Sequence, residues 1–344
     1  MPYENGQSMS ETLLRVDDLK VHFPLGGGLF AAAAGVLKAV DGVSLNLAPG
    51  RTLGLVGESG CGKSTLARAL TGMVAVTSGE IVFEDNTIRH DRAASWKALR
   101  RDVQMIFQDP LASLDPRMTV GQIVAEPLRH LRPELSRAER AQRVAAMIER
   151  VGLSQSQINR YPHEFSGGQC QRIGIARALV VEPKVLICDE PVSALDVSIQ
   201  AKIVELLQQL QAEFGIAILF IAHDLAVVRQ ISDEVMVMYL GRVMERAPSN
   251  TLFERPAHPY TRALLSAVPR PDPELERRRR RIALPGELPS PADPPSGCVF
   301  RTRCPWAQAD CAARTPALRP FGPDCQVACL HAEAVAEDRL AATG

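Results

Sequence analysis

A short apolar strand that runs into a glycine-rich loop and then into a helix constrains this chain most. Thr52–Val56 is apolar, residues 57–64 read Gly-Glu-Ser-Gly-Cys-Gly-Lys-Ser, and Ser64–Leu70 has helical periodicity. Glycine lets the backbone N–H groups of such a loop close around phosphate oxygens, and the helix N-terminus adds positive potential. Strand, loop and helix in this order are the context that the motif requires. The pattern predicts a nucleoside triphosphate site in an α/β fold.

The loop residues have distinct expected roles. Lys63 is expected to bridge the β- and γ-phosphates, and the Ser64 hydroxyl to bind Mg²⁺. The complete set expected to bind ATP within this segment is Gly57, Glu58, Ser59, Gly60, Cys61, Gly62, Lys63, Ser64 and Thr65.

Two acids follow a second buried strand. Val185–Cys188 is apolar and leads into Asp189 and Glu190; a helical pattern at 199–213 and an apolar strand at 216–222 come next. Alternating strands and helices predict a mainly parallel sheet covered on both faces. Sites in such sheets lie at the carboxyl ends of the strands. We therefore expect Asp189 to hold Mg²⁺ and Glu190 to polarise the attacking water as a general base.

Two further regions have their own patterns. Leu13–Phe23 and Leu37–Leu47 alternate apolar and polar residues, which predicts an antiparallel β entry with a Gly/Ala-rich hairpin insert at 26–35. Ser136–Val151 has helical spacing and ends at Gly152. We interpret residues of about 110–180 as an inserted helical subdomain.

Composition excludes several classes of protein. Lys+Arg and Asp+Glu are both 39, so bulk attraction to nucleic acid is not expected. No apolar run approaches the roughly 20 residues of a membrane span. The first residues include Glu4, Glu11 and Asp17 rather than the pattern of a secretion signal. We expect a cytoplasmic protein that serves any membrane process through partners.

A serine-glycine-glycine-glutamine element limits which family of nucleotide-binding proteins this chain resembles. It follows Phe165, comprises Ser166, Gly167, Gly168 and Gln169, and precedes an apolar-periodic helix, so its N–H groups face outward at a helix N-terminus. Together with the phosphate loop, the element resembles the nucleotide-binding domains of ABC transporters. The resemblance implies that these four residues contact ATP held by another subunit, so that one chain offers half of each of two sites.

The same resemblance assigns four more positions. Gln108 matches the glutamine that reaches Mg²⁺ and the water, His223 matches the switch histidine at the γ-phosphate, and Asp196 lies in the D-loop. Phe23 aligns with the aromatic that stacks on adenine, although a core aromatic at a strand end is the alternative. Cys170 stands where arginine is common, and we expect this exchange to weaken a contact near the phosphates or across the interface.

Further stretches resemble the second ATPase of bacterial dipeptide and oligopeptide importers, in the peptide/nickel subfamily. They include the run His258-Pro259-Tyr260-Thr261 and residues 285–291. The resemblance implies an ABC domain at 1–255, an extension at 256–344, and a peripheral place on the cytoplasmic face of the membrane. It also implies a paired ATPase that differs from this chain, two permeases and an external solute-binding protein. Nickel or another small solute is an alternative cargo, and a soluble ABC ATPase acting on nucleic acid or ribosomes is a remote one.

Five of the eight cysteines crowd into the extension. In close relatives the spacing of Cys298, Cys304, Cys311 and Cys329 resembles a [4Fe–4S] site, which thiolates would ligate. Zinc would also accept four thiolates, and reduced thiols without a metal are the third alternative. Cys325 is a fifth candidate, so the fourth ligand stays open.

Overall fold

Two β-sheets form the scaffold of the molecule. The computed structural model describes residues 12–26, 35–268 and 281–342. The larger sheet has the strand order β11-β12-β10-β9-β3-β8-β7-β6. Its parallel part comprises β3 (Thr52–Val56), β6 (Val103–Ile106), β7 (Val185–Asp189), β8 (Ala217–Ile221) and β9 (Glu234–Tyr239). The predicted mainly parallel sheet is confirmed.

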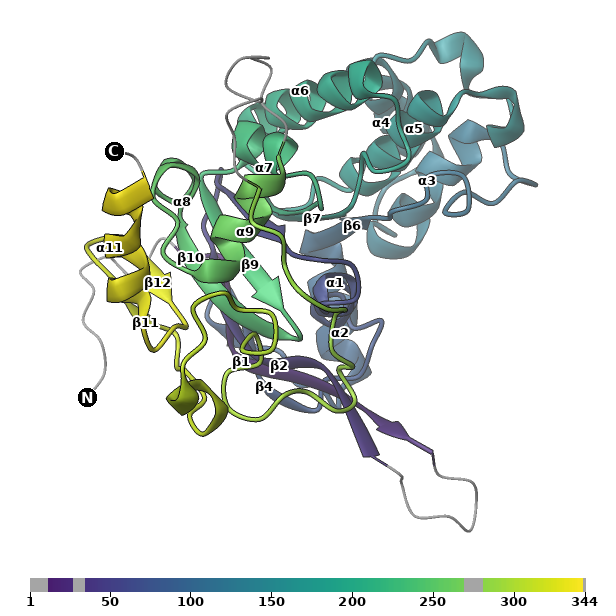
Figure 1. Cartoon of the computed structure of the whole chain (residues 1–344). Coiled ribbons are helices and arrows are strands. Elements are labelled where there is room, and N and C mark those ends of the chain that lie inside the picture. Colours follow the sequence, from purple (N-terminus) through teal and green to yellow (C-terminus); the bar gives the residue numbers. More distant parts are fainter. Residues whose placement is uncertain (1–11, 27–34, 269–280, 343–344) are drawn as a thin grey trace.

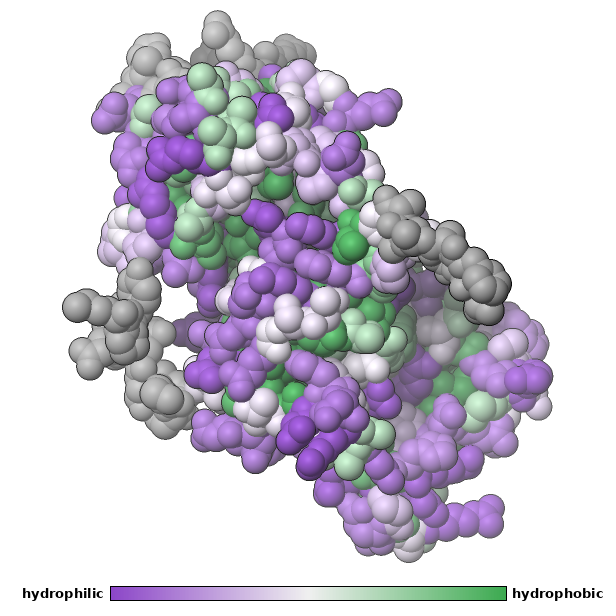
Figure 2. Space-filling view, turned by 90° about the horizontal axis from the view of Figure 1, so that it is seen from below, coloured by the Kyte–Doolittle hydropathy of each residue, from purple (hydrophilic) through white to green (hydrophobic). Residues whose placement is uncertain are grey.

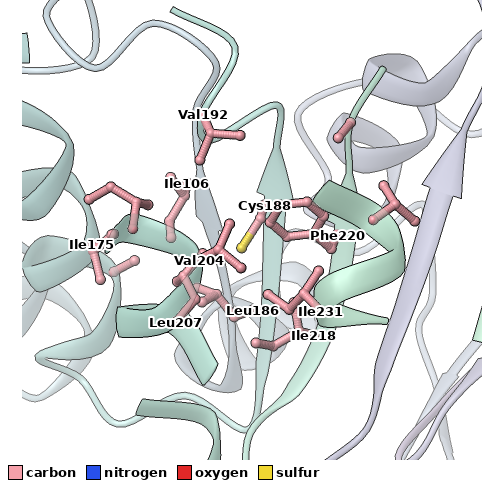
Figure 3. Packing of buried hydrophobic residues seen from close by; sticks show 14 of the residues in the cluster. Ile106, Ile175, Leu186, Cys188, Val192, Val204, Leu207, Ile218, Phe220 and Ile231 are labelled. Carbon is pink, nitrogen blue, oxygen red and sulfur yellow. The ribbon is translucent and has the colours of Figure 1, made fainter. Parts of the chain in front are cut away.

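The parallel strands are buried on both faces, and alternate residues enter two hydrophobic clusters. Leu186 and Phe220 pack in one cluster with residues of α6 (Val197–Phe214) and α7 (Leu225–Ile231), as Figure 3 shows. Ile187 enters the other cluster with residues of α1 (Lys63–Leu70). Each such burial is worth about 1.5–3 kcal/mol per large side chain. Packing on both faces explains why these strands read as continuous apolar runs.

The smaller sheet is antiparallel and has the order β2-β1-β4-β5. It comprises β1 (Leu14–Leu25), β2 (Gly35–Leu47), β4 (Ser78–Phe83) and β5 (Asn86–Thr87), and α2 (Ala93–Asp102) follows. The predicted antiparallel entry is confirmed. Most of the expected hairpin insert, residues 27–34, lies outside the described residues.

The described elements between residues 110 and 180 are helical and form a lobe away from the smaller sheet (Figure 1). They are α3 (Val120–Leu131), α4 (Arg137–Arg150), η2 (Gln155–Gln157), η3 (Pro162–Glu164) and α5 (Gly167–Leu179). Three α-helices begin with reciprocal capping boxes at Thr119, Ser136 and Ser166. Such caps satisfy backbone N–H groups that a helix cannot pair internally.

The C-terminal extension continues the larger sheet. It follows α8 (Ser249–Glu254), and its elements are α9 (Pro259–Ala267), η4 (Ala309–Ala312), β11 (Arg319–Pro320), β12 (Gln326–Val327) and α11 (Ala332–Ala342). β12 pairs with β10 (Arg242–Pro248), with Val327 opposite Glu245. The last part of the extension, with β11, β12 and α11 in yellow in Figure 1, therefore lies beside β10 and covers what would otherwise be a sheet edge.

The surface on one side of the molecule is mainly hydrophilic, and its hydrophobic residues form small separate groups (Figure 2). Within the described ranges, no helix is long and apolar enough to cross a membrane.

Glu245 joins β10 to the extension. Its carboxylate is fully buried and accepts hydrogen bonds from the backbone N–H groups of Ala257 (2.6 Å) and His258 (2.9 Å). The Cys325 sulfur lies 3.8 Å from the same carboxylate. Burial raises the pKa of Glu245, although the two backbone donors lower it in part. The acid therefore satisfies donors that would otherwise be unpaired inside the protein.

We predict that Glu245→Ala destabilises the protein by about 2–3 kcal/mol, because two buried N–H groups lose their acceptor. The matched control is Glu205→Ala on the exposed face of α6, which should change stability by no more than about 0.5 kcal/mol. Chemical denaturation followed by circular dichroism would measure both values. Equal stability of the two variants would contradict this role of Glu245.

Candidate active site

The phosphate loop is enclosed by backbone on both sides. Gly57 has φ +156°, and a Cβ there would lie 2.2 Å from the carbonyl oxygen of Met238. Gly62 has φ +107°, and its Cβ would lie 2.0 Å from the carbonyl oxygen of Ala39. Glycine is therefore required at both positions by the close approach of β9 and β2.

Lys63 folds back across the loop. Its side chain is buried, and Nζ donates to the carbonyl oxygens of Gly57 (2.8 Å) and Glu58 (3.1 Å). No carboxylate of the described residues forms an ion pair with it. Nζ also donates to Cys61 Sγ at 3.8 Å. A buried ammonium held by neutral groups is suited to an incoming phosphate.

Ser64 and Asp189 lie together although 125 residues separate them. Ser64 Oγ donates to Asp189 Oδ1 at 2.9 Å. Burial raises the pKa of Asp189, and the hydrogen bond from Ser64 opposes this shift. A hydroxyl and a carboxylate are hard oxygen ligands of the kind that Mg²⁺ prefers, so the residues fit this ion.

Glu190 receives two neighbours from adjacent strand ends. Gln108 Nε2 donates to Glu190 Oε2 at 2.9 Å, and His223 Nδ1 lies 3.5 Å from the same oxygen. Glu190 has φ +48°, which is uncommon for a residue other than glycine. Such backbone strain clusters at functional sites. The structure thus brings together the three residues predicted to act on the attacking water.

The serine-glycine-glycine-glutamine element lies at the start of α5. The Ser166 N–H donates to Gln169 Oε1 (3.0 Å), and the Gln169 N–H donates to Ser166 Oγ (3.4 Å). Ser166 and Gly167 are exposed. Within the described part of the chain, no hydrogen bond joins this element to residues 57–64. The element is therefore available to a ligand outside this chain's own phosphate loop.

Cys170 corrects one prediction. Its side chain is 0% exposed, packs in a hydrophobic cluster and donates to the carbonyl oxygen of Pro162 at 3.5 Å. Position 170 lies one turn after Ser166 and faces inward, because the exposed face of α5 begins at its first turn. The expectation that this cysteine alters a contact near the phosphates or across an interface is therefore wrong.

Phe23 and Asp196 are both accessible. Phe23 is 38% exposed near the end of β1, so its ring is free to contact a base. Asp196 precedes α6, is exposed and makes no capping hydrogen bond to that helix.

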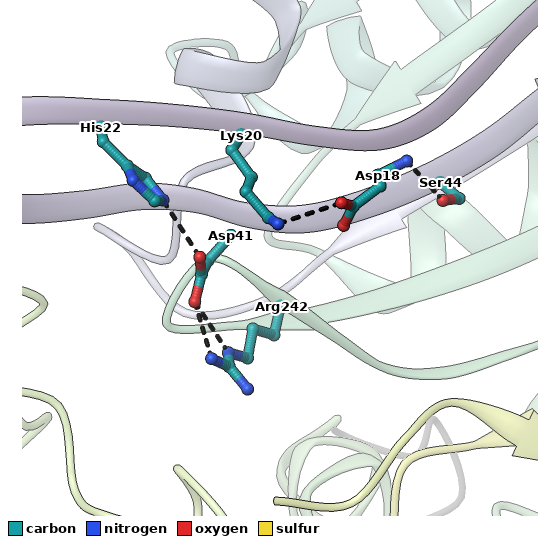
Figure 4. A network of polar contacts seen from close by, with 6 residues as sticks. All are labelled: Asp18, Lys20, His22, Asp41, Ser44 and Arg242. Atoms are coloured by element: carbon teal, nitrogen blue, oxygen red, sulfur yellow. Dashed lines mark hydrogen bonds and ion pairs between the residues drawn. The ribbon is translucent and has the colours of Figure 1, made fainter. Parts of the chain in front are cut away.

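The sequence patterns did not predict a polar network that lies beside Phe23. Asp41 lies 3.0 Å from His22 Nε2 and accepts from Arg242 Nη2 at 2.7 Å (Figure 4). Burial raises the pKa of Asp41, but Arg242 together with His22 and Lys38 outweighs this effect, so the pKa is lowered overall. The Asp41 N–H donates to Gly241, whose N–H donates to Cys61. The network therefore supports the phosphate loop from β2 and β10.

Four cysteines of the extension line one cavity of about 20 Å³: Cys298, Cys304, Cys311 and Cys329. Cys325 is not among the lining residues, because its sulfur faces Glu245. The backbone N–H of His331 donates to Cys329 Sγ at 3.4 Å, and the N–H groups of Phe300 and Trp306 approach Cys298 and Cys304. Such donors favour thiolates, the form that binds metals.

Burial works against charged sulfur in that cavity. It raises the pKa of Cys304 to about 12 and that of Cys329 to about 11, and the neighbouring cysteines add to both shifts. Asp310, Cys311 and His331 form a second possible ligand group, with ligand atoms within 4.8 Å of one another. The residues fit a soft cation or a cluster, because four thiol side chains line one cavity.

The folded site defines a class of protein, the ABC-type ATPases. The signature element lies apart from the chain's own phosphate loop. The family model for ABC transporters matches residues 40–193, and that for the oligopeptide/dipeptide transporter C-terminal region matches residues 244–311. A dimeric bacterial ABC transporter cassette, MJ0796, shares the fold with a TM-score of 0.61 and 27% identity, covering 69% of this chain and 99% of its own.

Curated relatives narrow the class. The chain is 60% identical to the oligopeptide transport ATP-binding protein OppF of Escherichia coli over 310 residues, 90% of this chain and 93% of that protein. It is 51% identical to the di/tripeptide transport ATP-binding protein DppF of Pseudomonas aeruginosa, over 94% of this chain and 98% of that protein. The chain belongs to the ABC transporter family and, within it, to the oligopeptide and dipeptide transport ATP-binding proteins.

We predict that Asp189→Asn does not destabilise the ligand-free protein. Because burial raises the pKa of Asp189, its charge costs stability above the pKa of the unfolded state, and asparagine removes that cost while still accepting from Ser64. The melting temperature should stay constant or rise by about 2 °C, whereas the additional stabilisation by Mg-ATP should fall.

Thermal melts with ATP, with and without Mg²⁺, would test this prediction. Asp224→Asn is the control, because Asp224 is an exposed acid just after β8. An Asp189→Asn variant with the full Mg²⁺-dependent shift would contradict the assignment of the metal ligand.

Proposed function

We propose that this chain is the ATP-binding and ATP-hydrolysing subunit that energises import of di- or oligopeptides through an ABC transporter. The observation that carries the proposal is the combination, in one chain, of a complete phosphate site and an oligopeptide-type extension packed on its sheet. The relatives named for oligopeptide and di/tripeptide transport support the cargo class.

The outward signature supports a paired arrangement. One chain would contribute Lys63 and Glu190 to an ATP, and a second, different ATPase would contribute its own signature. In return, Ser166–Gln169 of this chain would contact the ATP of the partner, where exposed N–H groups at a helix N-terminus favour an anion. The dimeric state described for the MJ0796 cassette is compatible with this arrangement.

The place of each residue in the folded site gives its proposed role in ATP binding or hydrolysis. Lys63 would bind the phosphates, Ser64, Asp189 and Gln108 would surround Mg²⁺, and adenine would stack on Phe23. Glu190 would accept a proton from the attacking water, while Gln108 and His223 orient the water. These groups position charge rather than form covalent bonds, the usual logic of phosphoryl transfer.

The complete complex would contain two permeases and an external solute-binding protein, with this chain peripheral on the cytoplasmic face. We propose that the chain is divided into an ABC domain at 1–255, with a helical subdomain at about 110–180, and an extension at 256–344.

The four cysteines that line one cavity would hold a [4Fe–4S] cluster, with zinc as the alternative. Bound there, either would supply the positive charge that lets buried thiolates persist. We assign it a structural role, because the cysteines come from separate loops and η4 of the extension.

We predict that Glu190→Gln slows ATP hydrolysis by about 10²–10⁴-fold while ATP still binds, because glutamine cannot accept the proton. The closed dimer should accumulate. The purified complete transporter, assayed for phosphate release and for retained nucleotide, is the system to use. Glu205→Gln, an exposed exchange on α6, should leave the rate within about twofold. Normal turnover of the Glu190 variant would refute its role.

We predict that Cys304→Ser loses bound metal, whereas Cys325→Ser retains it. The reason is that Cys304 lines the cavity and Cys325 does not. Iron and zinc analysis of anaerobically purified protein, with the visible absorption spectrum, would separate the two metals. Metal loss in the Cys325 variant, or unchanged content in the Cys304 variant, would overturn the ligand set.

A further inference from the structure

The C-terminal extension touches the phosphate loop directly at Glu58. The backbone N–H of Glu58 donates to the hydroxyl of Tyr260 at 2.9 Å. Arg303 Nη1 lies 2.6 Å from Glu58 Oε2, across 245 residues of sequence. The backbone N–H and the carboxylate of Glu58 are thus both bound by residues of the extension.

Both partners of Glu58 are rigidly fixed. Tyr260 is fully buried, with its ring centroid 4.8 Å from that of Tyr239 and 5.3 Å from that of Phe300. Arg303 is buried as well. The Glu58 side chain is 26% exposed and that of Arg303 10%. A charge-assisted hydrogen bond between largely shielded groups fixes geometry more strongly than an exposed ion pair.

The same short segment lines the cysteine cavity. Phe300 and Arg303 stand between Cys298 and Cys304, and Phe300 itself lines the cavity. The Cys298 N–H donates to the carbonyl oxygen of Cys311 at 2.8 Å. A change at these sulfurs would therefore move the segment that carries Arg303.

Electrostatics give this contact a consequence for nucleotide binding. Glu58 follows Gly57 in the loop that receives a polyanion, and a free carboxylate there would repel phosphate groups. Arg303 pairs with that carboxylate, and its side chain is largely shielded from solvent, where screening by salt is weak. Removal of Arg303 would both release the loop and expose ATP to a like charge.

We propose that the extension acts as a clamp on the phosphate loop: Arg303 is a positioning residue for nucleotide binding, and the state of the four-cysteine cavity is coupled to nucleotide affinity through residues 298–304. The ATP site rests on the proposed function, while the clamp itself rests on the contacts to Glu58. By thermodynamic reciprocity, bound nucleotide then protects the cysteine module by the same factor.

Binding of a fluorescent Mg-ATP analogue to the full-length chain tests the first part. Arg303→Met should weaken affinity by about 5- to 150-fold, the usual range of such coupling, and Arg303→Lys should recover part of it. Glu58→Gln should weaken affinity less than Arg303→Met does. The double variant should resemble Glu58→Gln, because no unpaired carboxylate is left. The control is Arg314→Met, an exposed arginine of the same extension.

The rate at which the cavity thiols react with a maleimide tests the second part. Mg-ATP should slow labelling of Cys304 and Cys329 in the native protein and in Arg314→Met, but not in Arg303→Met. Peptide mass spectrometry would report each cysteine, and circular dichroism would establish that the variants are folded.

The outcomes separate the clamp from the assignments beneath it. Folded Arg303→Met with native affinity, or with native protection of the thiols by Mg-ATP, would overturn the clamp. Failure of the native chain to bind the analogue at all would instead refute the proposed ATP site. Purified protein without iron or zinc would refute the cofactor, and the affinity series would still decide the clamp.

Discussion

The burial of a parallel sheet on both faces is the constraint on which the rest of this structure depends. Parallel strands that are covered on both sides expose polar groups only at their ends, so chemistry gathers at the carboxyl edge. Here that edge brings together Gln108, Asp189 and His223, which follow β6, end β7 and follow β8. Their shared edge explains why residues more than 80 positions apart meet within hydrogen-bond distance.

The same site works against local stability. Asp189 is buried with a raised pKa, Glu190 adopts a left-handed backbone conformation, and Lys63 is buried among carbonyl groups. Each feature is unfavourable in the protein alone, and the two buried charged groups gain partners of opposite charge when a phosphate and a cation bind. Two large hydrophobic clusters on either side of the sheet provide the stability that offsets these local costs.

The sequence predicted those parts of the molecule that depend on local pattern. Apolar runs located β3, β7 and β8 to within a residue, and helical spacing over Ser136–Val151 located α4 to within a residue at each end. Contacts between distant side chains could not be predicted this way. The inward direction of Cys170 depends on how α5 packs, and no periodicity indicates that Arg303 meets Glu58. The pairing of β12 with β10 was likewise hidden, because a two-residue strand leaves no pattern.

The run from His258 to Thr261, which resembles the peptide importers, connects the extension to the phosphate loop. His258 Nδ1 accepts from the Tyr260 N–H at 3.0 Å, and the buried Glu245 accepts from the His258 N–H. The turn that results aims the Tyr260 hydroxyl at Glu58. Since Glu245 lies opposite Val327 on β12, the strand that docks the extension and the tyrosine that touches the phosphate loop share one buried carboxylate. An extension attached at this carboxylate cannot shift without disturbing the turn, so its position and that of the phosphate loop are mechanically linked.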